Sequence, residues 1–192
     1  MSKAMKNPCK VVTGPKTVMS YLNVNEPKIP LGGGTPKYSV SLIIPKSDTV
    51  TVAKIRAAIK AAYEEGESKL KGTGNFLPAL EGLKTPLRDG DKDRKGDPAY
   101  ANSWFVNANS TLRPYTVDAN KEPILETSEL YSGIIGRAVI NFYAYNNKSK
   151  GIAAGLNGIQ KLSDGTPLGG QSRPEDDLAD LDDEDEDDDF LS

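Results

Sequence analysis

The chain has 192 residues and a formal net charge of only −3, and 37% of its residues are hydrophobic. That length suits one domain with a real core better than two full domains. The sequence has no histidine and a single cysteine, Cys9. It therefore excludes Ser-His nucleophilic triads, a histidine general base, an internal disulfide and nearly every familiar zinc site. We expect a protein that is not an enzyme and needs no cofactor.

The small net charge hides an uneven distribution along the chain. Twelve of the 27 acidic residues fall within the last eighteen positions, 175–192, which contain no Lys or Arg. The remaining 15 acids face all 24 bases, so residues 1–174 carry about +9. We predict a basic body over 1–170 and a disordered acidic tail over 171–192, which indicates a polyanionic partner or an intramolecular imitation of one. A plain solubilising tail is the alternative, because blocks of like charge are usually solvated.

The sequence shows no signal for a membrane or for secretion. No apolar run approaches the roughly 18 residues that a membrane-spanning helix needs. The N-terminal segment MSKAMKNPCK lacks the apolar stretch of a signal peptide. Together with the lone cysteine, these features predict a cytoplasmic protein.

The first predicted elements are β-strands separated by Gly and Pro. Residues 9–24 are rich in β-branched side chains and are interrupted by Gly14-Pro15, which predicts one bent strand or two short ones. The Gly- and Pro-rich residues 25–37 predict a loop. Residues 38–46 then alternate as in a strand with one face in the core. The apolar members of that face are Tyr38, Val40, Leu42 and Ile44.

One amphipathic helix is predicted next. Ser47 or Asp48 can cap its N-terminus, and the helix is expected to end near Gly66. Its apolar residues recur at helical spacing, at Val52, Ile55, Ile59, Ala62 and Tyr63. Residues 72–99 are predicted to be mostly loop, with the highest density of charge in KTPLRDGDKDRKGDPAY.

Three further strands are expected, near residues 103–109, 133–146 and 151–162. The second has a continuous apolar face, made of Ala138, Ile140, Phe142 and Ala144. Around five strands, bends marked by glycine and one intervening helix fit a mainly β OB fold, which is a five-stranded Greek-key barrel with long loops. A β-sandwich has similar strands, so periodicity alone leaves the closure of the barrel open.

Two short motifs resemble ligand sites but lack the required spacing. GGGTPK, residues 32–37, does not follow the GxxxxGK[ST] pattern and precedes a strand, so we interpret it as a flexible loop whose Lys37 can still meet a phosphate. RDGDKDRKGD begins like a calcium loop, but Arg94 and Tyr100 stand where Gly and Glu are needed. Its aspartates, from Asp89 to Asp97, suit a two-metal nuclease or a solvated loop of mixed charge. The bases interleaved with them are Arg88, Lys92, Arg94 and Lys95.

Aromatic residues on one predicted strand indicate a binding surface. Tyr143 and Tyr145 lie two positions apart on the face opposite Phe142. Arg137 and Asn141 share the face of the tyrosines. Such rings can stack on nucleic-acid bases while neighbouring Lys and Arg follow the phosphates. The alternative is that the rings pack beneath the helix or a loop.

A second aromatic pair lies on the strand near residues 103–109. Trp104 and Phe105 are adjacent and must point to opposite faces, so one is expected in the core and the other outside. The polar Asn107 and Asn109 share the face of Phe105. This favours Phe105 as the exposed residue.

Taken in order, these segments resemble a known family. The series TVMSYLNVNEPK, KYSVSLIIPKSD, KTPLRDGD and LYSGIIGRAVINFYAYNNKSKGIAAGLNGIQKL, followed by an acid-rich tail, is similar over most of the chain to bacteriophage single-stranded DNA-binding proteins. The resemblance implies an OB-fold body that coats single-stranded DNA during phage replication and recombination, in the cytoplasm of the host cell. It also implies a tail that contacts replication partners. Such tails typically finish with an aromatic or apolar residue, whereas DDDFLS places Ser192 last.

We therefore predict a single-stranded DNA-binding protein without enzymatic activity, whose acidic tail competes for the DNA groove and recruits replication or recombination proteins. The expected DNA-binding residues are Lys37, Arg88, Lys92, Arg94, Lys95, Phe105, Arg113, Arg137, Asn141, Tyr143 and Tyr145. The expected partner-binding residues of the tail are Asp187, Asp188, Asp189, Phe190 and Leu191. The alternatives are an acidic-tailed interaction scaffold or chaperone, and a metal-dependent nuclease.

Overall fold

The structure is a computed structural model that describes residues 6–30 and 32–168. Its frame is a closed barrel of five strands. These strands are β2 (Thr17–Lys28), β3 (Lys37–Pro45), β5 (Ser103–Ser110), β7 (Ile135–Asn146) and β8 (Lys150–Ser163). They pair in the cyclic order β7, β2, β3, β5, β8 and back to β7, and the β5–β8 pair is parallel while the other pairs are antiparallel.

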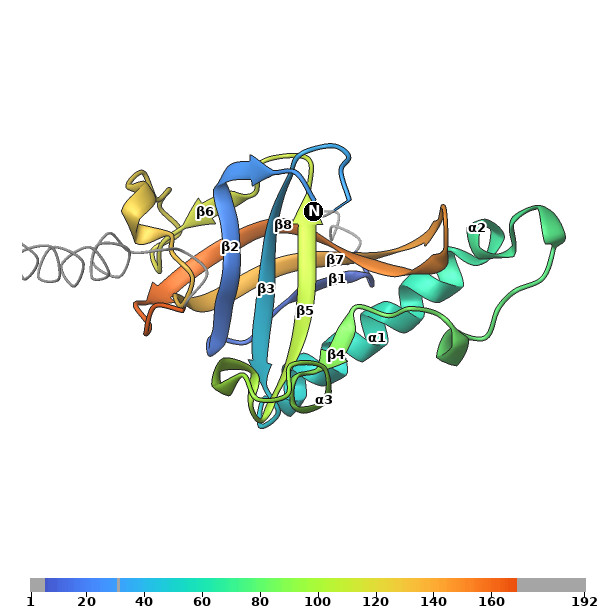
Figure 1. Ribbon diagram of the computed structural model, residues 1–192, viewed down its shortest axis with the longest axis horizontal. Coiled ribbons are helices and arrows are strands. Elements are labelled where there is room, and N and C mark those ends of the chain that lie inside the picture. Colours follow the sequence, from blue (N-terminus) through green and yellow to red (C-terminus); the bar gives the residue numbers. More distant parts are fainter. Residues whose placement is uncertain (1–5, 31, 169–192) are drawn as a thin grey trace, which may run out of the picture.

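This connectivity confirms the predicted OB fold. The pairing of β7 with both β2 and β8 closes the sheet on itself, which excludes the sandwich alternative. In Figure 1, β2, β3 and β5 cross β7 and β8 at a steep angle. Because core side chains fill the barrel interior, a ligand can lie only on the outer surface of these strands.

Three short strands extend the barrel sheet. β1 (Lys10–Val12) pairs with β7, β4 (Leu87–Asp89) pairs with β5, and β6 (Tyr115–Val117) runs parallel to β8. The break between β1 and β2 falls at the predicted Gly-Pro pair. β2 continues to Lys28, into residues that the composition predicts as loop, because residues as far as Lys28 still pair with β3.

Strand alternation sorts the side chains between the core and the outside. The predicted apolar face of β7 is fully inside, since Ala138, Ile140, Phe142 and Ala144 are all buried. On β3 the core receives Val40, Leu42 and Ile44, whereas Tyr38 is only partly covered. The odd-numbered positions of β7 consequently face outward, as the pattern predicts.

Helix α1 (Thr49–Glu65) begins and ends where the sequence predicts. The carboxylate of Asp48 accepts the backbone N–H of Thr51 at 3.2 Å, and the N–H of Gly66 donates to the carbonyl of Ala62 at 2.9 Å. The apolar side of the helix joins the barrel core through Val52, Ile55, Ala58, Ile59 and Ala62. A short helix, α2 (Glu67–Lys71), follows. Within residues 6–30 and 32–168, no helix is long and apolar enough to cross a membrane.

Residues 87–102, called the lid below, are more ordered than the predicted loop. The lid contains β4, the short helix α3 (Gly90–Asp93) and a 3₁₀ turn at Pro98–Tyr100. Tyr100 packs with Ile43 and Phe105 in a second small core, separate from the barrel interior. The lid therefore covers one part of the outer face of β3 and β5, at the end where α3 lies in Figure 1.

Candidate nucleic-acid interface

A belt of small polar residues crosses the outer face of the barrel beyond the lid. The strand register places Asn141 opposite Gly155, Gly155 opposite Asn109, and Asn109 opposite Ser39. Ser39 in turn lies opposite Asn23. These residues are half-buried, so each retains contact with solvent. The belt, Asn23-Ser39-Asn109-Gly155-Asn141, offers amide and hydroxyl groups that can both donate and accept hydrogen bonds.

The predicted aromatic strip crosses this belt along β7. Tyr143 is 41% exposed, and Tyr145 is half-buried. The tip of Tyr145 covers Gly151, because a Cβ added there would lie 2.6 Å from the Tyr145 hydroxyl. Asn141 covers Gly155 in the same way, at 2.7 Å from its Oδ1. The strip therefore lies low against the sheet and faces outward, as predicted.

The prediction that Phe105 is exposed is wrong. Its ring has no exposed surface and meets Tyr100 edge to face, with 5.1 Å between ring centroids. The hydroxyl of Tyr100 donates to the hydroxyl of Ser41 at 3.0 Å, and this bond attaches the lid to the sheet. Asn107 lies beyond the lid and is exposed, so the polarity of neighbouring positions misled the assignment. Phe105 in this position supports the fold and cannot stack on a base.

Trp104 is the partly exposed member of the aromatic pair. Its ring lies next to the main core, with the Arg56 guanidinium 5.0 Å and the Lys46 ammonium 5.4 Å from its centroid. Two cations near one ring compete with any base for the ring face. We therefore do not include Trp104 in the candidate interface.

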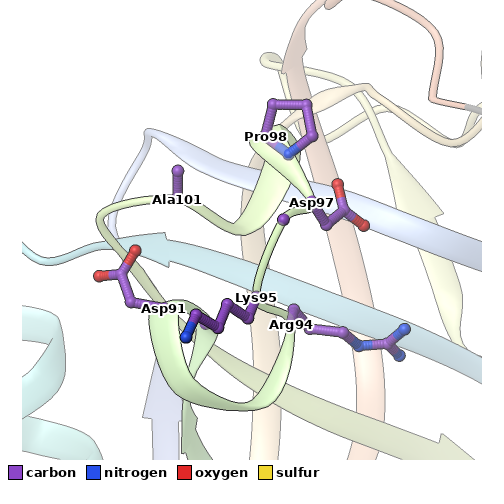
Figure 2. Close-up of a pocket in the computed structure, with 8 residues that line it drawn as sticks. Asp91, Arg94, Lys95, Asp97, Pro98 and Ala101 are labelled. Atoms are coloured by element: carbon purple, nitrogen blue, oxygen red, sulfur yellow. The ribbon is translucent and has the colours of Figure 1, made fainter.

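The four basic residues of the lid differ in their contacts: the two arginines lie near aromatic rings, whereas the two lysines do not. Arg88 pairs with Asp93 at 3.1 Å and lies 5.3 Å from the Phe105 ring centroid. Arg94 is half-buried, and its guanidinium lies 5.4 Å from the ring of Tyr21 and within 6 Å of two lid-core rings. Lys92 and Lys95 are exposed. Figure 2 shows Arg94 and Lys95 leaving the loop in opposite directions. Both residues line a hollow of about 290 Å³.

The aspartates of the lid serve its folding. The ammonium of Lys46 contacts Asp89 at 2.9 Å and Asp91 at 2.7 Å. Hydrogen bonds to Asp89 and then Asp91 raise the pKa of Lys46, and the bond from Lys46 lowers the pKa of each carboxyl. Asp97 caps its own turn by accepting the N–H of Ala99 at 3.0 Å. In the described part of the chain, no three or more His, Cys, Asp or Glu side chains are grouped to hold a metal ion.

The remaining predicted residues lie at the edges of the face. Lys37 stands opposite Lys28 at the base of the β2–β3 hairpin, and Arg113 is exposed in the loop after β5. Arg137 is half-buried and donates to the carbonyl of Thr13 at 3.3 Å. Lys10, which sequence reasoning missed, is exposed on β1 directly opposite Asn141. Its position depends on the β1–β7 pairing, which residue spacing does not reveal.

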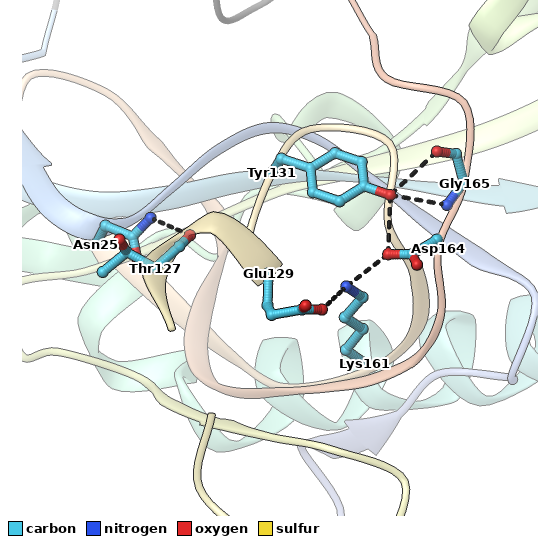
Figure 3. Close-up of polar contacts among 7 residues, drawn as sticks. All are labelled: Asn25, Thr127, Glu129, Tyr131, Lys161, Asp164 and Gly165. Carbon is cyan, nitrogen blue, oxygen red and sulfur yellow. Dashed lines mark hydrogen bonds and ion pairs between the residues drawn. The ribbon is translucent and has the colours of Figure 1, made fainter. Parts of the chain in front are cut away.

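A buried lysine fixes the place where the chain leaves the barrel. The ammonium of Lys161 contacts Glu129 at 2.5 Å and Asp164 at 2.7 Å, and the hydroxyl of Tyr131 donates to Asp164 (Figure 3). Burial opposes the charge of Lys161, but hydrogen bonds to Asp164 and Glu129 outweigh it and raise its pKa. The chain then turns so that the N–H of Leu168 donates to the carbonyl of Ser132 at 2.9 Å. The predicted tail residues, Asp187 to Leu191, lie outside the described residues.

Residues 9–191 match the sequence model of a family described as the ssDNA-binding protein of Enterobacter phage Enc34. The chain belongs to this family. A relative, protein p50 of Acyrthosiphon pisum secondary endosymbiont phage 1, is 32% identical over 155 residues, which cover 79% of this chain and 83% of p50. The predicted relationship to bacteriophage single-stranded DNA-binding proteins is confirmed.

Solved structures agree with the Enc34 family assignment. The single-stranded DNA-binding protein from bacteriophage Enc34, as a C-terminal truncation, is 25% identical with a TM-score of 0.69, over 87% of this chain and 95% of that one. The same protein in complex with ssDNA gives 25% identity and a TM-score of 0.67, over 88% and 97%. Bacteriophage T7 gp2.5, also a single-stranded DNA-binding protein, shares the fold at 16% identity and a TM-score of 0.57, over 89% and 93%.

Proposed function

We propose that the chain binds single-stranded DNA on the outer face of its barrel and does not cut it. One observation carries the proposal: the strip of Tyr143 and Tyr145 lies on the solvent side and is continuous with the amide belt. Membership of the Enc34 family supports it, because the Enc34 protein has been solved in complex with ssDNA. The +9 charge of residues 1–174 supports it further, since a phosphate backbone is the matching polyanion.

The geometry of the outer face suits an extended single strand of DNA. Opposite the strip, β8 presents Gly151, Ala153 and Gly155, so no side chain longer than a methyl group rises toward the strip from residues 151–155. Bases can stack on Tyr143 and Tyr145, and sugar and phosphate oxygens can reach the amides of the belt. A base inside a duplex has both faces stacked on its neighbours. The strip therefore favours single strands over double strands.

Basic residues at the borders supply the charge. Lys10 lies on one side of the strip, Lys37 lies at the hairpin base, and Arg88 and Arg94 lie at the edge of the lid. The accessible part of the face stops at the lid, because Tyr100 covers the outer surface of β3 and β5 at Ile43 and Phe105. Phosphates neutralised by these bases release counterions, so affinity should fall as salt rises.

The acidic tail is proposed to compete for this face and to recruit replication or recombination proteins. Leu168, the last described residue, packs against the small core under the lid. A segment that starts there has an effective concentration on the order of millimolar at the face, so its twelve acids can compete with phosphates. Bound DNA would displace the acids and leave Phe190 and Leu191 available to a partner.

Fluorescence anisotropy with a labelled oligothymidylate tests the binding proposal. We expect saturable binding that weakens with salt, resists competition by duplex DNA and leaves the oligonucleotide intact with magnesium present. Absence of binding at low salt would reject the proposal. Shortening of the oligonucleotide only in magnesium would establish the nuclease alternative instead.

A further inference from the structure

Tyr115 on β6 covers a glycine of β8. The parallel register places Tyr115 beside Gly158, and a Cβ added to Gly158 would collide with the Tyr115 ring. An alanine at position 158 would therefore displace the ring. Although it lies on the sheet, Tyr115 is 52% exposed, more than Tyr143.

A β-bulge brings Gly158 to the same outer face as the aromatic strip. On β8, Leu156 pairs with Ile140 and Gly158 pairs with Val139. Between these two pairs β8 has one more residue than β7, which defines a β-bulge. Without the extra residue, Asn157, strand alternation would turn Gly158 toward the core. The bulge thus places Tyr115 in line with Asn141 and the two tyrosines of β7.

The glycines of β8 follow one pattern. Gly151 is covered by Tyr145, Gly155 by Asn141 and Gly158 by Tyr115. Each glycine lets a planar side chain from a neighbouring strand lie low on the sheet, where a ring can present a face to solvent. Between the pairs at Gly151 and Gly158, β7 advances from Tyr145 to Val139, or about 20 Å, a length that suits the roughly 4 to 16 nucleotides that an OB fold contacts.

We propose that Tyr115 is a further base-stacking residue, which receives a base of the same single strand that passes over Tyr143 and Tyr145. This inference rests on the proposed function. Arg113, two residues earlier and exposed, is placed to meet the adjoining phosphate. The site therefore extends along β8 beyond the belt, from the β7–β8 turn as far as β6.

A purely structural role, in which Tyr115 only shields the backbone of Gly158, makes different predictions. Tyr115→Leu keeps an apolar cover over Gly158 but removes the π-face, whereas Tyr115→Phe keeps both. If the ring stacks, Tyr115→Leu and Tyr115→Ala should each weaken oligothymidylate binding by on the order of tenfold, and Tyr115→Phe should bind as the wild type does. Phe76→Ala is the matched control, because Phe76 is 73% exposed in the segment after α2 and belongs to neither the strip nor the belt.

Contact is measured separately by photo-crosslinking the wild-type chain to an oligonucleotide containing 5-iododeoxyuridine and locating the adduct by mass spectrometry. An adduct on Tyr115, together with weak binding by folded Tyr115→Leu, supports the inference. Full affinity of Tyr115→Leu with no adduct overturns it. If Tyr143→Ala binds the oligothymidylate more weakly than the wild type in that case, the proposed function stands and only the extension to Tyr115 fails. If Tyr143→Ala also binds normally, the proposed face itself is wrong.

Discussion

Tyr143 and Tyr145 have neighbouring positions but unequal surroundings. Tyr143 is the more exposed of the two and lies opposite Ala153, whereas the tip of Tyr145 rests on Gly151 near the carbonyl of Lys84. Truncation of Tyr145 therefore removes packing as well as a ring face. Tyr143 is the better probe of DNA contact.

Tyr143→Ala should weaken single-stranded DNA binding by about 1 to 3 kcal/mol, the free energy of one base stacked on an aromatic ring. The thermal unfolding midpoint should stay close to that of the wild type, because Tyr143 is exposed and belongs to neither core. Anisotropy titration and a melting curve measure the two quantities. A folded variant with wild-type affinity would remove Tyr143 from the site.

Phe105 is the opposite case, an aromatic residue with a structural role. Phe105→Ala should lower the free energy of unfolding by about 3 to 5 kcal/mol, because it empties the centre of the small core formed with Ile43 and Tyr100. Denaturant titration measures this change. Phe105→Leu, which keeps most of the volume, should cost clearly less. Unchanged stability of Phe105→Ala would mean that the lid does not close on the sheet as described.

Among the elements, the lid combines packing with charge. Its guanidinium groups at Arg88 and Arg94 lie over aromatic rings, while Lys92 and Lys95 extend into solvent. The ion pairs that Lys46 makes with Asp89 and Asp91 are partly exposed and contribute little to stability by themselves. The lid is therefore attached mainly by the packing of Tyr100 and by the pairing of β4 with β5.

Replacing Arg88, Lys92, Arg94 and Lys95 together by Ala should make the dependence of log affinity on log salt less steep. Each phosphate contact that is lost changes the slope by about 0.7 for a single strand. The pairwise variants separate charge from packing: Lys92→Ala with Lys95→Ala should leave the melting temperature unchanged, whereas Arg88→Ala with Arg94→Ala should lower it. An unaltered slope in the fourfold variant would show that the lid bases do not meet phosphates.

Elements with strong local signals could be predicted, and those that depend on distant contacts could not. Alternation of apolar residues located β3 and β7, and Asp48 with Gly66 marked both ends of α1. The lid escaped prediction because Tyr100 packs on Ile43 and bonds to Ser41, which lie more than fifty positions away in the sequence. The bulge at Asn157 escaped for a similar reason, since the extra residue is recognised only once β7 and β8 are paired. The candidate site was thus predictable along one strand but not across strands.

In the molecule as a whole, the closed barrel uses its interior for stability and leaves its outer face for recognition. The core side chains are fully enclosed by the five strands and α1, so substitutions on the amide belt should affect binding with little effect on folding. Charge is also divided between two parts of the whole molecule: residues 1–174 are basic, and residues 175–192 contain twelve acids. The proposed competition of the tail for the binding face rests on these two features.

Deletion of residues 175–192 should tighten single-stranded DNA binding if the acids compete for the face. The gain should be largest at low salt, because exposed charges are screened beyond about 8 Å at physiological ionic strength. Deletion of residues 190–192 alone keeps all twelve acids, so it should barely change DNA affinity while weakening a partner that uses Phe190 and Leu191. If the full deletion has no effect even at low salt, the tail does not compete for the face.

The central claim is that the amide belt and the tyrosine strip form the surface that meets DNA. Two-dimensional NMR of the ¹⁵N-labelled protein during titration with a short oligothymidylate tests it most directly, because the side-chain amides of Asn23, Asn109 and Asn141 give their own signals. We predict that these signals and the backbone amides of 141–145 and 153–158 shift most, while those of α1 stay in place. The largest shifts on α1 and the indole of Trp104, with the belt unchanged, would contradict the account.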